Sequence, residues 1–101
     1  MIFHSRMFVG ETAGKHKMQL LWNLKRGKKQ KDLYVITLAE GTGKLLEVYH
    51  GEALQLKLFR TEDRTIVGLA VGKEESEAVL TDIVQTVYKE TGDLKVREYF
   101  A

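Results

Sequence analysis

Apolar residues run without a polar interruption through residues 66–71. A strand that is apolar on both faces is typical of the inside of a sheet covered on each side. Residues 79–88 then repeat apolar positions at spacings of three and four, which is the period of an amphipathic helix. We therefore predict a buried strand at 66–71 that leads into a helix at 74–91. Gly92 is suited to the left-handed conformation that ends such a helix.

Two further strands are predicted earlier in the chain. Residues 33–38 are rich in β-branched and aromatic side chains and almost continuously apolar, as in a central strand. Residues 2–9 predict a short strand that Gly10 ends. The last residues, 94–100, finish in two adjacent aromatic side chains, which we expect to dock onto the core.

Residues 15–26 fit two patterns. Met18, Leu21, Trp22 and Lys25 fall on one helical face, yet the apolar residues between 18 and 24 also alternate with the period of a strand. We favour a helix, because long unbranched side chains dominate and Gly27 is well placed just after its end. On this interpretation the stripe that contains Trp22 faces the core.

Residues 44–60 carry conflicting signals. Residues 45–49 fit a short strand or a helical turn. Leu54, Leu56 and Leu58 alternate with polar residues as in a strand, whereas a helical stripe is formed by Ala53, Leu54, Leu58 and Phe59. If the strands at 33–38 and 66–71 are adjacent and parallel, this segment forms a right-handed crossover and should contain a helix. The two alternatives stay open on the sequence alone.

Length and composition favour one domain. A chain of 101 residues, 44% apolar and 30% charged, has the size and balance of a single globular domain. It contains no cysteine, which excludes disulfides and thiolate chemistry and suits a reducing cytoplasm. No apolar run approaches the roughly 20 residues needed to cross a bilayer. We expect a single cytoplasmic α/β (or α+β) domain over residues 1–101, with a mixed sheet and no membrane partner.

The charge is unevenly distributed. Residues 15–31 hold seven cations and no acid, so a net charge of +2 leaves −5 on the rest of the chain. Such a segment, with Trp22 in its middle, predicts binding of nucleic acid or another polyanion, or of an acidic protein. A solvated surface is the competing interpretation. The candidate residues are Lys15, Lys17, Lys25, Arg26, Lys28, Lys29 and Lys31.

Two glycine-containing segments fail as phosphate sites. Residues 41–44 read Gly-Thr-Gly-Lys, but the positions of the missing glycine and hydroxyl are Leu38 and Leu45. Residues 68–72 lead from a strand to a helix N-terminus, where anions commonly bind. The three glutamates that follow within residues 74–77 already supply negative charge there, so close packing explains the small residues better.

No catalytic, metal or cofactor residue is predicted. His4, His16 and His50 lack metal-ligand spacing, and neither serine lies in a nucleophile motif. The only grouping suited to acid–base chemistry places Glu47 and Glu52 near His50. These observations favour a protein that is not an enzyme.

Several short segments within residues 33–101 resemble small uncharacterised bacterial proteins of about this length. That resemblance implies a compact intracellular α/β domain and no functional residue. The segments are Tyr34-Val-Ile-Thr-Leu-Ala39, Leu46-Glu-Val48, Ile66-Val-Gly-Leu-Ala70, Glu77-Ala78, Ile83-Val84, Thr91-Gly-Asp93 and Tyr99-Phe100.

A fully apolar strand in so short a chain favours an interaction or accessory module that self-associates as a dimer. The expected interface lies at the last helix and the chain end, with Val87, Tyr88, Tyr99 and Phe100 as candidate residues. Polyanion binding through residues 15–31 is the alternative function.

Overall fold

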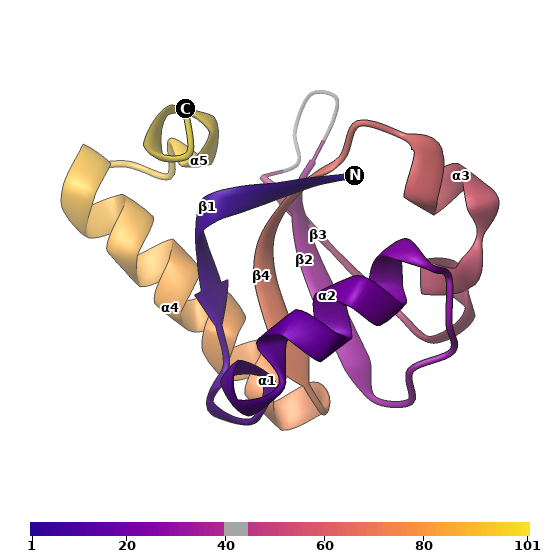
Figure 1. Cartoon of the computed structure of the whole chain (residues 1–101). Helices are drawn as coiled ribbons and strands as arrows, with labels where there is room; N and C mark the ends of the chain where they lie inside the picture. Colours follow the sequence, from indigo (N-terminus) through magenta and orange to yellow (C-terminus); the bar gives the residue numbers. More distant parts are fainter. Residues whose placement is uncertain (40–44) are drawn as a thin grey trace.

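The computed structural model describes residues 1–39 and 45–101 (Figure 1). In this part of the chain, one mixed sheet has the strand order β1–β4–β2–β3. β4 pairs parallel with β1 and antiparallel with β2, and β3 pairs antiparallel with β2. The predicted mixed sheet, with residues 33–38 and 66–71 at its centre, is confirmed. The strands are β1 (Ile2–Val9), β2 (Leu33–Leu38), β3 (Leu46–His50) and β4 (Thr65–Val71).

The helices agree with the sequence in the last third and differ in the first. α4 matches the helix predicted at 74–91, and Gly92 follows it in the left-handed conformation, with φ 73°. The helix predicted at 15–26 is confirmed as α2, but His16, with φ −130°, separates it from a further short helix, α1, that was not predicted. The helices are α1 (Glu11–Lys15), α2 (Lys17–Lys25), the 3-10 helix η1 (Gly51–Gln55), α3 (Lys57–Thr61), α4 (Lys73–Thr91) and α5 (Val96–Tyr99).

Gly27 ends α2 as predicted. Its φ is +69°, a conformation that a side chain disfavours. The Gly27 N–H donates to the Leu24 carbonyl at 3.1 Å, and the Lys28 N–H donates to the Asn23 carbonyl at 3.0 Å. These two bonds satisfy carbonyls that the end of the helix leaves without partners.

The crossover forms between a different pair of strands. β2 and β4 are neighbours but antiparallel, so the condition for a crossover between them is not met. β3 and β4 instead run in the same direction on either side of β2, and residues 51–64 connect them through η1 and α3. Within this segment residues 46–50 form the strand β3, whereas Leu54 lies in η1 and Leu58 in α3, so the helical alternative holds for these leucines and the strand alternative is wrong.

Two hydrophobic cores lie on opposite faces of the sheet. In the first core, Leu33, Val35 and Ile66 pack against residues of α1, α2, η1 and α3. In the second core, Ile36 and Val67 pack against α4 and α5. Figure 1 shows α2 crossing in front of the strands while α4 lies beyond β1. The chain's own helices thus cover both faces of β4, which explains its uninterrupted apolar sequence.

The C-terminal residues dock onto the second core, as expected. Phe100 is 5% exposed. The ring of His4 meets the Phe100 ring edge-on, with centroids 5.0 Å apart, and His4 Nε2 donates to the Phe100 carbonyl at 2.8 Å. These contacts connect β1 to the C-terminal residues.

We expect Gly68→Ala to destabilise the fold by about 1–3 kcal/mol, the usual range for overpacking. A Cβ atom at Gly68 would lie 2.9 Å from Cβ of Ile36, in the contact between sheet and α4. Gly14→Ala is the matched control, because a Cβ atom there meets only Val9, at 3.8 Å, and alanine favours the helix by about 0.5–1 kcal/mol. Urea unfolding measures both changes. Equal stability of the two variants would contradict this packing.

Candidate functional site

The parallel strands β1 and β4 end side by side, and each continues through a glycine into a helix. Gly10 leads into α1 and Gly72 leads into α4. In α/β sheets the space beyond such strand ends is the usual place for a ligand. A pocket of about 620 Å³ lies there, lined by Phe8, Val9, Gly10, Glu11, Thr12, Val71, Gly72, Glu74, Glu75, Ala78, Val79 and Asp82.

The carboxylate of Glu75 occupies the backbone donors at this point. Its oxygens accept hydrogen bonds from the N–H groups of Val71 at 2.6 Å, Thr12 at 2.6 Å and Ala13 at 3.2 Å. Gly10 has no side chain with which to cap α1, so a carboxylate from α4 satisfies the first turn of that helix. A Cβ atom on Gly10 would lie 2.5 Å from Cδ of Glu75, so the glycine leaves room for the carboxylate.

Glu75 therefore stands where a phosphate would bind in a nucleotide site. Partial burial raises the pKa of Glu75, but the hydrogen bonds from Val71, Thr12 and Ala13 outweigh it and hold that pKa below the ordinary 4.5. The carboxylate is thus a permanent internal anion at neutral pH. The contacts that Glu75 makes with β4 and α1 were missed by sequence reasoning.

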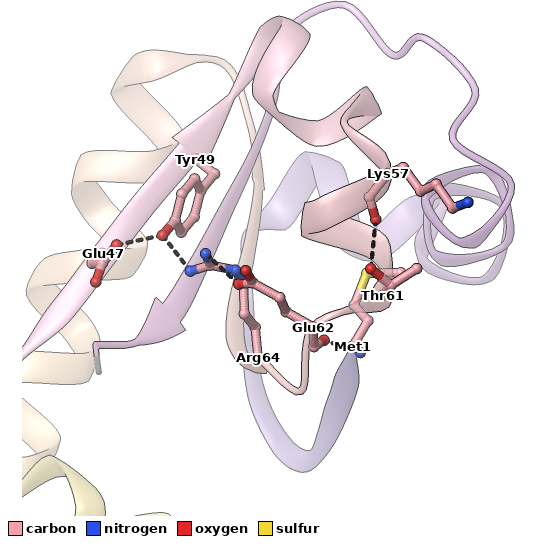
Figure 2. A network of polar contacts seen from close by, with 7 residues as sticks. All are labelled: Met1, Glu47, Tyr49, Lys57, Thr61, Glu62 and Arg64. Atoms are coloured by element: carbon pink, nitrogen blue, oxygen red, sulfur yellow. Dashed lines mark hydrogen bonds and ion pairs between the residues drawn. The ribbon is translucent and has the colours of Figure 1, made fainter. Parts of the chain in front are cut away.

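A polar network lies on the first-core side of the sheet, near β3 (Figure 2). The Tyr49 hydroxyl donates to Glu47 and accepts from the guanidinium of Arg64, which pairs with Glu62 at 2.6 Å. Burial and the bond to Glu47 raise the pKa of Tyr49 above its ordinary 10.0. The Tyr49 hydroxyl thus links β3 to Arg64, the residue just before β4.

The grouping around His50 separates in the structure. His50 stacks on Tyr34 with centroids 4.7 Å apart, and both border a pocket of about 240 Å³ with Glu52. Glu47 turns away from them to Tyr49. Within residues 1–39 and 45–101, no three His, Asp or Glu side chains are grouped to hold a metal ion. The glycine-containing segment 41–44 lies outside the described residues.

The basic residues divide into two groups. Lys15 and Lys17 lie where α1 ends and α2 begins, whereas the other five follow from the end of α2 into the loop before β2. Lys17 and Lys25 are the first and last residues of α2. At 1.5 Å per residue they lie roughly 12 Å apart along the helix. The five cations that gather at the C-terminal end of α2 are Lys25, Arg26, Lys28, Lys29 and Lys31.

The expectation that Trp22 enters the core is wrong. Trp22 is 61% exposed and Met18 is 77% exposed, although both lie on α2. Leu24 is buried, and Leu20 and Leu21 pack against the first core in their place. α2 carries two apolar stripes, and the sheet has room for the leucine stripe only.

The exposed stripe forms a groove of about 460 Å³ between α2 and β1. Phe3 from β1 closes one side of it, and Lys25 reaches back so that its Nζ lies 5.2 Å from the centre of the Phe3 ring. Lys25 is the charged side chain in the lining of this groove, and no acid occurs in residues 12–31. We call this surface the α2 groove; it is lined by Phe3, Met18, Gln19, Leu21, Trp22 and Lys25.

The residues expected at a self-association interface do not share one surface. Val87 is fully buried in the second core beside Phe100. Tyr99 is half-buried, with the Arg6 guanidinium 5.0 Å from the centre of its ring. Tyr88 is 60% exposed and is the one of the four that is largely open to a partner.

Comparison with protein-family models, with curated proteins and with solved structures found no match to this chain. The resemblance to small bacterial proteins thus stays a prediction. No helix in the described residues is long and apolar enough to cross a membrane.

We expect Glu75→Gln to destabilise the protein by about 2 kcal/mol at neutral pH, because an amide group cannot accept all three N–H bonds. A carboxyl whose pKa is lowered by folding stabilises above its unfolded pKa, and that contribution is lost as the pH falls through the folded pKa. The difference between wild type and variant should therefore shrink below pH 4.5. Urea unfolding over a series of pH values measures it.

Glu74→Gln is the control, because Glu74 is exposed on the same turn of α4. It should change stability little at any pH. A Glu75→Gln variant as stable as wild type at neutral pH would show that the carboxylate does not hold these elements together.

Proposed function

We propose that this protein is a non-enzymatic interaction module that binds an acidic protein segment in the α2 groove. The observation that carries the proposal is an exposed tryptophan and methionine in an apolar groove that Lys25 also lines. Large exposed apolar patches with a polar rim mark interaction sites. The partner's apolar side chain enters the groove, and its acids meet Lys25 and Arg26.

The composition of the groove suits a protein partner. Trp and Arg dominate the residues that carry binding energy at protein interfaces, and methionine adapts its shape to different ligands. Trp22 and Met18 lie one helical turn apart on α2, so a single side chain of the partner can contact both. The wall formed by Phe3 stands on β1, which gives the groove one rigid side.

We expect Trp22→Ala to abolish measurable binding of a labelled Asp- and Glu-rich peptide that has one central Phe. Loss of a hot-spot tryptophan typically costs about 2 kcal/mol or more. Folding stability should change by no more than about 0.5 kcal/mol, because the side chain is exposed. Fluorescence anisotropy of the peptide and urea unfolding of the protein give the two values.

Charge reversal tests the cationic border separately. Lys25→Glu/Arg26→Glu should weaken binding about tenfold, because each reversal removes an exposed ion pair of about 0.2–1 kcal/mol and adds a repulsion. Lys89→Glu, on the exposed side of α4, is the matched control and should leave binding unchanged. A peptide with Ser in place of Phe should bind poorly. Binding that Trp22→Ala leaves intact, or that Lys89→Glu weakens as much, contradicts the proposal.

Nucleic acid is the second candidate, favoured by the exposed indole next to Lys25 and Arg26. Aromatic rings among cations stack on the bases of single strands. Binding of short labelled RNA and DNA at two salt concentrations tests it, with the same variants. Binding that falls steeply with salt and is lost in Trp22→Ala would assign the groove to nucleic acid.

A further inference from the structure

The two edges of the sheet, β1 and β3, differ in how they are protected. At the β1 edge, pairing with β4 is interrupted between Phe3 and Phe8. There the side chains of His4 and Arg6 donate to the carbonyls of Phe100 and Tyr99, so the C-terminal residues lie against the irregular part of β1. β3 stands at the other end of the strand order, with β2 as its neighbour and a continuous register.

The register shows which backbone groups of β3 point outward. The Ala39 N–H donates to the Leu45 carbonyl at 3.2 Å, which makes residues 39 and 45 a hydrogen-bonded pair. In an antiparallel ladder such pairs alternate, so Glu47 and Tyr49 also direct their N–H and C=O groups toward β2. Leu46, Val48 and His50 therefore direct theirs to the open edge.

Within the described residues, β3 lacks the lysine, proline and bulge that commonly guard an exposed edge. Proteins guard exposed edges with lysine, proline, bulges or covering elements. β3 reads Leu-Glu-Val-Tyr-His and contains neither lysine nor proline. Val48, in the middle of β3, is 42% exposed, and so is Leu45, the residue just before the strand.

We infer that β3 pairs with β3 of a second copy of this chain, in antiparallel orientation about Val48. The outward groups are symmetric about that residue, so the two Val48 residues face each other and Leu46 of each copy faces His50 of the other. The two sheets then join into one continuous sheet through strand addition. This two-fold contact needs no surface other than β3 itself.

The charges of β3 permit this pairing. Glu47 is its single acid, and in this register it lies opposite Tyr49 of the second copy rather than the other Glu47. Like charges directly opposite each other would oppose the pairing, and here they are avoided. The contact spans five residues per copy, so it falls at the small end of interface sizes and the association should depend on concentration.

Amide hydrogen exchange followed by NMR tests the inference at single residues. Raising the protein concentration should slow exchange at the amides of Leu46, Val48 and His50. The amides of Glu47 and Tyr49 pair with β2 and should be protected at every concentration. Concentration-independent exchange at Val48 would overturn the inference.

Sedimentation equilibrium of two variants locates the interface. Val48→Lys places a charge on the exposed edge and should give a monomer at concentrations where wild type is dimeric. Tyr88→Lys, on α4, is the matched control and should remain dimeric. A wild-type protein that is monomeric throughout, or a dimer lost in Tyr88→Lys and kept in Val48→Lys, would overturn the pairing. The inference is independent of the α2 groove, whose binding to the acidic peptide is measured with the same variants.

Discussion

A single carboxylate from α4 joins the two parallel β–α units of this fold. Glu75 accepts one N–H at the end of β4 and two from the first turn of α1. Without it, the first turn of α1 and the end of β4 would lack partners for backbone donors in a partly buried place, which is costly. The same contact disfavours anion binding at the ends of β1 and β4, because the carboxylate of Glu75 already occupies the position that an anionic ligand would take.

The two surfaces proposed for binding lie on the outside of the fold. Glu75 occupies backbone donors at the strand ends, and the Tyr49 hydroxyl is bonded to Glu47 and Arg64. The α2 groove and the β3 edge are different: each exposes apolar side chains, and β3 also exposes backbone groups. Our proposals place partner recognition on the first and self-association on the second.

The central strands and the last helix were predictable because their signals are local. The apolar run of β4 and the regular spacing in α4 each require a covered environment, whatever the rest of the chain does. The orientation of α2 was not predictable in the same way. Its leucines and its Met18–Trp22 stripe are equally apolar, and only packing against β1 and β2 decides which of them is buried.

The role of Glu75 also depends on distant residues. The sequence predicted a favourable charge at the N-terminus of α4, but it did not indicate that Gly10 leaves α1 without a cap. The break at His16 and the crossover between β3 and β4 likewise depend on how the whole chain folds. The basic segment was visible in the sequence, whereas its division into two groups came from the intervening length of α2.

The most direct test of this account is the fluorescence of Trp22, the only tryptophan in the chain. An indole exposed among cations should emit at the long wavelength of a hydrated ring. Iodide, which the positive surroundings attract, should quench it more strongly than caesium at the same concentration. Short-wavelength emission with weak quenching by both ions would place Trp22 in a core and contradict the assignment of the α2 groove as the binding surface.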